Sequence, residues 1–157
     1  MSDSREIHVR MCELKIGGSG DILRTTLGSC VGIGLLWRSR RIYGLAHCLL
    51  PEAPQPSFAL TAKYVDEAVP ALFSMMGLEN GPRDQVEAVL AGGACIMQRP
   101  ISARPMIGDQ NVCAAERMLA AAGIRIVHSD VGGTHGRQLL VDGELHQYTV
   151  RKIVRPT

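Results

Sequence analysis

Two apolar runs joined by a short polar link constrain the fold of this chain more than any other feature. The runs are VGIGLLW at residues 31–37 and IYGLAHCLL at residues 42–50, and the link carries Arg38, Ser39 and Arg40. Each run has the length of a strand and contains no Asp, Glu, Lys or Arg, which is typical of a strand covered on both faces. We therefore predict a β-hairpin whose two strands are buried on both faces.

Composition places the chain among compact globular proteins. It has 157 residues, of which 46% are hydrophobic, and this suits a single domain spanning residues 1–157. The 17 basic and 15 acidic residues nearly cancel, which argues against binding of nucleic acid by phosphate neutralisation. No apolar stretch reaches the roughly 18 residues that a membrane span needs, so we expect no membrane insertion. The polar first residues do not resemble a secretory signal, and we expect the cysteines to be reduced.

Strand and helix patterns alternate along the rest of the chain. Alternating polarity predicts one strand over residues 6–16, with Cys12 among its inward side chains. Apolar residues three and four apart predict a helix that Thr61 caps, that Pro70 kinks or breaks and that Gly77 ends. The other expected elements are a buried strand at 86–94, a helix at about 109–122, a strand at 124–130 and a hairpin with Asp142 and Gly143 in its turn.

This order of elements, β-β-β-α-β-α-β-β-β, decides the fold class. Adjacent hairpins favour α+β over a doubly wound parallel sheet. We expect a β-rich core of mixed or antiparallel strands, with two packed sheets as one arrangement, flanked by about two helices.

The hairpin brings a cysteine and a histidine together. If Arg38 and Ser39 form the turn, Cys30 lies directly opposite His47, within reach of a hydrogen bond. A four-residue link places His47 opposite Gly32 instead, on the same face and diagonal to Cys30. An odd link length without a bulge would separate the two side chains. A thiol beside an imidazole can act as a nucleophile, because the imidazole lowers the thiol pKa and takes its proton.

Other interpretations of these residues remain open at this point. Cys30 and His47 could be two core residues of a buried hairpin. Gly28 and Ser29 allow a sharp turn before the thiol, where free backbone N–H groups could hold an oxyanion. No paired-ligand spacing supports a zinc site. We expect the remaining cysteines to be buried packing residues: Cys12, Cys48, Cys95 and Cys113.

Five motifs carry a resemblance to a known family. LGSCVGIGL and GLAHCLLP resemble the L-G-S-C-V and A-H-x-x-L-P signatures of the CheD family, the chemoreceptor glutamine deamidases. The resemblance continues in AGGACIM (91–97), IGDQN (107–111) and DVGGTHGR (130–137). It therefore covers roughly residues 7–153, in the order and spacing of the family.

The resemblance implies a reaction and a set of roles. Specific glutamines of methyl-accepting chemotaxis receptors would be hydrolysed to glutamate in the cytoplasm. Cys30 would attack the carboxamide to form a thioester, and His47 would transfer the protons. This chemistry needs no metal or organic cofactor. In the family a threonine shortly before the Gly-Ser-Cys turn completes the site. Here we favour Thr25 as that residue, and Thr26 is the alternative.

The resemblance also implies a partner, and the residues leave further expectations and rival functions. A CheC-type phosphatase is a candidate partner beside the receptors. His135 and Arg137 are expected in a solvated loop, with receptor contact as the alternative. A non-catalytic adaptor, or a cysteine amidase acting on another substrate, remains open as a rival function. The candidate substrate-binding residues are Gly28, Ser29, Gly92, Gly93 and Asn111.

Overall fold

The structure is a computed structural model that describes residues 4–55, 60–95 and 106–154. These residues form two β-sheets and two α-helices, which confirms the α+β class with two packed sheets. The four-stranded sheet has the order β1 (Arg5–His8), β3 (Asp21–Leu27), β8 (Arg137–Asp142), β9 (Gln147–Lys152). The five-stranded sheet has the order β2 (Leu14–Gly17), β5 (Ile42–Cys48), β4 (Val31–Trp37), β6 (Glu87–Gly92), β7 (Arg125–Val131). The helices are α1 (Val65–Met76), α2 (Ile107–Ala121) and the short 3-10 helices η1 (Arg38–Arg40) and η2 (Arg83–Gln85).

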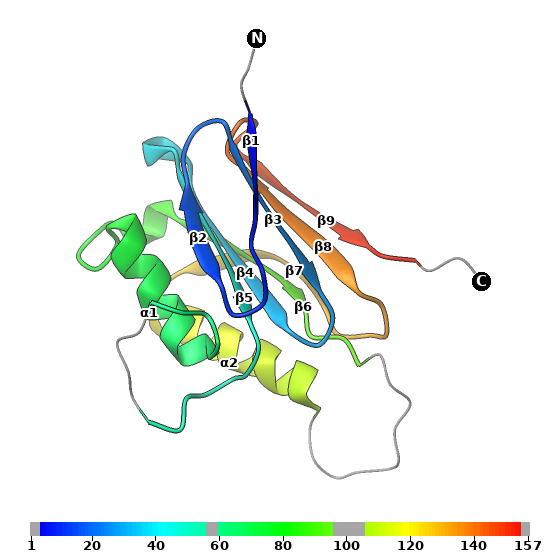
Figure 1. Cartoon of the computed structure of the whole chain (residues 1–157). Helices are drawn as coiled ribbons and strands as arrows, with labels where there is room; N and C mark the ends of the chain where they lie inside the picture. Colours follow the sequence, from blue (N-terminus) through cyan, green and yellow to red (C-terminus); the bar gives the residue numbers. More distant parts are fainter. Residues whose placement is uncertain (1–3, 56–59, 96–105, 155–157) are drawn as a thin grey trace.

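The elements are arranged in three layers (Figure 1). The four-stranded sheet packs on one face of the five-stranded sheet, and α1 and α2 cover the other face. Buried aliphatic side chains fill both spaces: Ile33 and Leu72 lie on the helix side, and Leu45 and Leu139 lie between the sheets. Cys30 belongs to the second group, so its side chain packs between the two sheets.

The apolar hairpin forms as expected, but its link is not the two-residue turn. β4 is buried throughout and β5 is buried after its first residue. The four residues 38–41 join them, so His47 lies opposite Gly32 and diagonal to Cys30, the second of the two expected registers. A Cβ on Gly32 would come within 2.7 Å of the Leu27 side chain. Glycine at this position therefore lets the two sheets approach one another.

The single strand expected over residues 6–16 is wrong, because the chain turns in its middle. β1 and β2 lie in different sheets, and Cys12 between them has φ 69°, a left-handed conformation that favours glycine. The N–H of Cys12 donates to the His47 carbonyl, and the His47 N–H donates to the Glu13 carbonyl, both at 2.9 Å. Two residues thus face one, as in a β-bulge. Polarity alternates on both sides of the bulge, so the pattern did not reveal it.

Both expected helices form, with differences at the start of the first. α1 ends at Gly77, as expected, where the backbone turns left-handed. It begins after Tyr64 and has no side-chain cap, so the expected cap by Thr61 is wrong. The helix also continues unbroken through Pro70. The ring removes only the hydrogen bond to the Asp66 carbonyl, which lies in the first turn.

The remaining expected strands are also found. The strands at 86–94 and 124–130 are β6 and β7, and residues 143–146 join β8 to β9 in the expected hairpin. Residues 96 and 97, the end of the 91–97 motif, lie outside the described residues. Within the described ranges, no helix is long and apolar enough to cross a membrane.

Candidate active site

The turn Gly28–Cys30 carries the chain from the four-stranded sheet into the five-stranded sheet. Cys30 is only 4% exposed. The end of β6 holds this turn through two backbone hydrogen bonds. The N–H of Gly93 donates to the Cys30 carbonyl at 2.9 Å, and the N–H of Ala94 donates to the Gly28 carbonyl at 3.0 Å. The position of the thiol is therefore set by backbone rather than by side-chain packing alone.

Two glycines allow β6 to pass this close to the turn. Gly92 has φ 108°, and a Cβ on it would collide with the Cys30 carbonyl. A Cβ on Gly93 would collide with Val112 of α2. The two glycines thus permit a close backbone approach, whereas their contact with a substrate stays a prediction.

Thr25 and His47 meet in the space between the sheets. The Thr25 hydroxyl lies 2.6 Å from the Val9 carbonyl and 2.7 Å from Nδ1 of His47. A hydroxyl has one proton, and the carbonyl can only accept it, so Nδ1 must be the donor to Thr25. The proton of the neutral imidazole then resides on Nδ1, which leaves the lone pair of Nε2 free. Nε2 is buried and has no hydrogen-bond partner among the described residues.

The strand geometry separates Thr25 from the neighbouring threonine. Successive side chains of β3 point to opposite faces. Thr25 is fully buried and faces the second sheet, whereas Thr26 is exposed on the outer face. Of the two, only Thr25 contacts His47. The geometry therefore favours Thr25, and its role in the reaction stays a prediction.

Burial controls the protonation of both groups. Burial, with a smaller contribution from nearby His8, lowers the pKa of His47 to about 4. Burial also raises the pKa of the Cys30 thiol, with a further contribution from Cys12. The pKa of the thiol is thus raised, not lowered as expected from a neighbouring imidazole, and burial is the largest cause. The resting pair is a neutral thiol and a neutral imidazole.

Asn111 connects α2 to this region. Its side chain is fully buried, and its Nδ2 donates to the carbonyls of Ser29, at 3.2 Å, and Leu49, at 3.0 Å. Its Oδ1 is buried without a partner among the described residues. The structure thus brings Asn111 beside the Cys30 turn, as its position in the sequence pattern suggested.

Arg137 is buried, and the sequence pattern did not predict this burial. The expectation of a solvated loop is wrong for it, since it begins β8 and is 3% exposed. It forms an ion pair with Asp130 at 3.0 Å and donates to the carbonyls of Gly92 and Gly132, and of His135. It therefore fixes the same Gly92 that lies against the Cys30 carbonyl. His135 itself is exposed, as expected.

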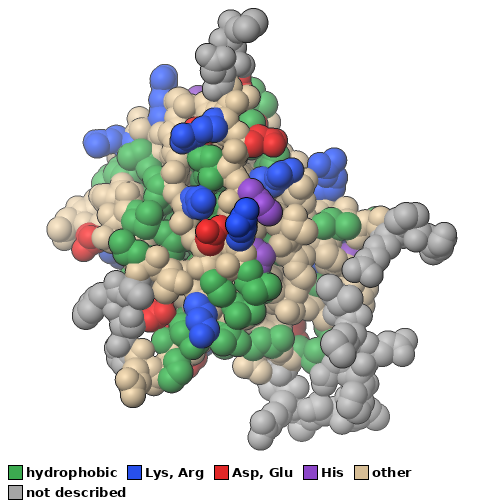
Figure 2. All heavy atoms as spheres, in the orientation of Figure 1, with side chains coloured by type: hydrophobic (Ala, Val, Ile, Leu, Met, Phe, Trp, Pro, Cys, Tyr) green, Lys and Arg blue, Asp and Glu red, His purple; other side chains and the backbone are tan. Residues whose placement is uncertain are grey.

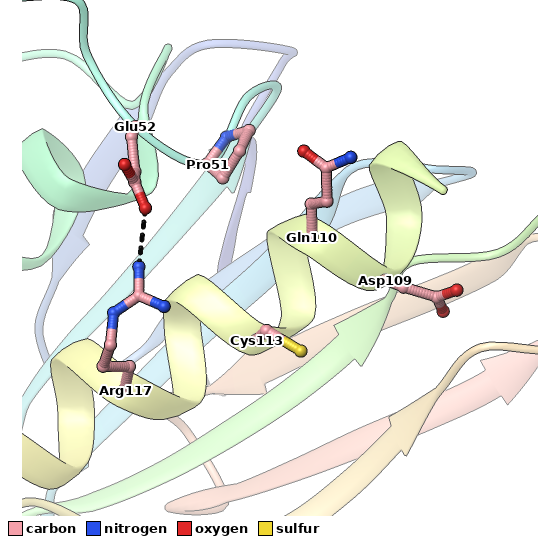
Figure 3. Close-up of a pocket in the computed structure, with 6 residues that line it drawn as sticks. All are labelled: Pro51, Glu52, Asp109, Gln110, Cys113 and Arg117. Carbon is pink, nitrogen blue, oxygen red and sulfur yellow. Dashed lines mark hydrogen bonds and ion pairs between the residues drawn. The ribbon is translucent and has the colours of Figure 1, made fainter. Parts of the chain in front are cut away.

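The other cysteines divide by exposure. Cys48 is buried on the helix face of β5, as expected, whereas Cys12 and Cys95 are half-buried. The expectation of a buried Cys113 is wrong, because it lies on the outer face of α2. There it lines an open groove with a volume of about 310 Å³ (Figure 3). The other residues that line this groove are Pro51, Glu52, Asp109, Gln110 and Arg117, with Arg117 paired to Glu52 at 2.8 Å.

These exposures predict the order in which iodoacetamide modifies the thiols at neutral pH. Cys113 should react first, because it is the exposed thiol. Cys30 and Cys48 should react slowly, since burial raises the pKa of both and keeps them as thiols. Peptide mass spectrometry over a time course would measure the order. Modification of Cys30 before Cys113 would contradict the neutral resting state.

The described residues form no cluster of metal ligands, and cations lie on the surface over β1 and β2. Within the described ranges, no three His, Cys, Asp or Glu side chains cluster so that they could hold a metal ion. Figure 2 shows Lys and Arg side chains over the face that carries β1 and β2, next to hydrophobic side chains. Arg10 and Lys63 are exposed cations beside this edge of the sandwich.

The fold and the site define an α+β protein in which an imidazole bonded to a hydroxyl lies diagonal to a buried thiol between two packed sheets. Comparison with known proteins then gives the family. The family model described as CheD chemotactic sensory transduction matches residues 49–152. The chain belongs to the CheD family.

Relatives of nearly the same length support this assignment. A probable chemoreceptor glutamine deamidase CheD 2 of Ruegeria sp. is 36% identical over 96% of this chain and 93% of its own. A probable chemoreceptor glutamine deamidase CheD of Bdellovibrio bacteriovorus is 36% identical over 94% and 95%. One of Pyrococcus abyssi, with the same name, is 38% identical over 96% and 94%.

Proposed function

We propose that this protein is a chemoreceptor glutamine deamidase that acts in the cytoplasm through Cys30, His47 and Thr25. The observation that carries the proposal is the hydrogen bond between Thr25 and Nδ1 of His47, which leaves Nε2 free beside the Cys30 strand. The names of the full-length relatives support the substrate class, which is a glutamine side chain of a chemotaxis receptor.

The first half of the reaction releases ammonia. Nε2 of His47 takes the proton of the Cys30 thiol as Sγ attacks the carboxamide carbon of the substrate. The negative oxygen that develops accepts a hydrogen bond from a backbone N–H of the Gly28–Cys30 turn. His47 then gives its proton to the leaving nitrogen, the C–N bond breaks, and a thioester remains.

The second half restores the enzyme. His47 takes a proton from a water molecule as the water attacks the thioester carbon, the C–S bond breaks, and glutamate leaves. The thiolate of Cys30 recovers its proton from His47. Thr25 holds the imidazole in one orientation and one tautomer through both halves, because its own proton is committed to the Val9 carbonyl. Gly28, Ser29, Gly92, Gly93 and Asn111 shape the place where the carboxamide binds, and no metal or organic cofactor takes part.

The partners follow from this function. The receptor substrate would be the cytoplasmic helical region of a methyl-accepting chemotaxis receptor, and a CheC-type phosphatase would be a regulatory partner. The exposed cations near the site, Arg10 and Lys63, favour a substrate surface with acidic side chains.

The proposal is tested by incubating a receptor cytoplasmic fragment with the protein and mapping glutamine-to-glutamate changes by mass spectrometry. Wild type should convert specific glutamines, and Cys30→Ala should convert none. Cys113→Ser is the matched control, because it removes an exposed thiol on the outer face of α2, and it should act like wild type. If wild type binds the fragment and changes no glutamine, the protein is an adaptor. If it hydrolyses other amides and spares the receptor, it is an amidase of another specificity.

A further inference from the structure

The Cys30 turn lies one residue beyond the point where the β-ladder between β4 and β5 ends, and His47 lies one residue inside that end. The last pair between β4 and β5 is Val31 with Cys48. Cys30 comes one residue before this pair on β4, and Leu49 comes one residue after it on β5. No ladder hydrogen bond therefore fixes the distance between the Cys30 turn and the end of β5.

Asn111 supplies the missing connection. Its Nδ2 donates one hydrogen to the carbonyl of Ser29, directly before Cys30. It donates the other to the carbonyl of Leu49, two residues after His47. Both donors of one amide are used, and one acceptor lies on each side of the site. The Asn111 amide, which comes from α2, thus links the two chain segments just beyond the last ladder pair.

α2 packs against the same region, so the Asn111 side chain projects from a backbone that is fixed in place. A Cβ on Gly108 would lie 2.5 Å from the Gly93 carbonyl, and Val112 packs against Gly93 from the next turn. Gly93 in turn donates to the Cys30 carbonyl. The helix therefore contacts β6 at the point where β6 supports the turn.

The burial of Asn111 carries a cost that packing does not explain. The side chain is fully buried, and its Oδ1 has no partner among the described residues. A buried acceptor without a donor is unfavourable, and an apolar side chain would avoid it. The benefit must therefore come from the two donated hydrogen bonds.

We propose that Asn111 is a positioning residue for the deamidation reaction, which sets the separation of the Cys30 turn and the His47 strand through the carbonyls of Ser29 and Leu49. It acts through these backbone groups, because both hydrogens of its amide are donated to them. This inference rests on the proposed function and assigns one further residue to the same site.

The sharpest test is Asn111→Asp, which keeps the shape and Oδ1 but replaces both donors. The ionised carboxylate of this variant would face two carbonyls and release both, so kcat should fall about 10²-fold at pH 8 while KM changes little. A protonated carboxyl can donate to one carbonyl again. Burial raises the pKa of such a carboxyl, so kcat of the variant should recover in part as the pH is lowered from about 8 to 5.

In wild type, kcat should change little between about pH 5 and 8, so a recovery in the variant can be measured there. His47 stays neutral because its pKa is about 4, and burial raises the pKa values of Cys30 and Cys48, so these groups keep their charge over the range. The exposed carboxyls of α2, Asp109 and Glu116, are present in both wild type and variant, so the difference between the two profiles isolates position 111. A merely structural loss would lower kcat without a recovery at acid pH.

A labelling measurement and a second variant test the role of Asn111 further. Iodoacetamide labelling of Cys30, in a Cys113→Ser background, should be faster in Asn111→Asp than with Asn111, because the turn is released. This readout does not need enzyme activity, so it separates failure of the inference from failure of the proposed function. If Asn111→Asp does not fold, Asn111→Ser carries the test, with about a tenfold loss of kcat and no acid recovery. The inference would be overturned if Asn111→Asp had the same kcat as wild type at pH 8. It would also be overturned if the loss of kcat did not depend on pH and the labelling of Cys30 were unchanged.

Discussion

Replacing His47 with glutamine is expected to lower kcat/KM for deamidation by about 10²–10⁴-fold, the usual contribution of a general base. The glutamine amide can still donate to the Thr25 hydroxyl, so the local hydrogen bond survives. It has no basic nitrogen in the place of Nε2, and the neutral Cys30 thiol then has no acceptor for its proton. The measurement is the initial rate of glutamate formation in a receptor fragment.

The matched control is His128→Gln on β7, where the side chain is exposed and stacks on Tyr148. This variant should keep its kcat/KM, because its imidazole has no contact with the site. The wild-type kcat/KM should be flat across neutral pH and fall only as the pH approaches about 4, since the pKa of His47 sets the acid limb. An acid limb near pH 6.5, or an active His47→Gln, would refute His47 as a buried neutral base.

The same substitution changes stability in a defined direction. The pKa of His47 is about 4 when folded and 6.5 ordinarily, so between these values only the unfolded chain binds the proton. The free energy of unfolding of wild type should therefore fall as the pH drops from 6.5 to 4, by on the order of 3 kcal/mol from this group. His47→Gln should lack this part of the decline. Urea denaturation of both proteins at about pH 7 and 4.5 would measure the difference without any assay of activity.

The diagonal placement of Cys30 and His47 was predictable because the apolar runs and the length of the link determine the register of the hairpin. Apolar runs of strand length and a link of even length suffice to place Cys30 and His47 on one face. Thr25 was harder, because its partner lies in the other sheet. The alternation of β3 places Thr25 on the face of Leu23 and Leu27, but the hydrogen bonds of Thr25 with Val9 and His47 come from distant segments.

The features that the sequence did not predict depend on contacts between distant segments. Cys12 occupies a left-handed position where glycine is usual, and the bulge is visible only from its bonds to His47. Arg137 follows a glycine-rich loop and looks solvated, yet Asp130 on β7 and three carbonyls enclose its guanidinium. A pattern in the local sequence cannot identify a hydrogen-bond or ion-pair partner that lies far away in the chain.

Replacing Arg137 with methionine is expected to lower the free energy of unfolding by about 3–5 kcal/mol, because it breaks a partly buried ion pair and leaves carbonyls without their donor. The methionine fills the space but leaves the Asp130 carboxylate without its cation. It also leaves the Gly92, Gly132 and His135 carbonyls without their guanidinium donor. For a chain of this length the midpoint of thermal unfolding should fall by roughly 10 °C.

Arg151→Met is the matched control, since the Arg151 side chain is exposed on β9 and bonds only Gln138 among the described residues, at 3.0 Å. Its effect should stay within about 0.5 kcal/mol. Arg137→Lys keeps the charge but not the planar fork, so its loss should lie between those of the two methionine variants. Because Gly92 lies against the Cys30 turn, Arg137→Met should also speed labelling of Cys30 at temperatures where the protein remains folded. A loss of under about 1 kcal/mol would mean that water replaces the guanidinium at these carbonyls, and that β6 alone holds the turn.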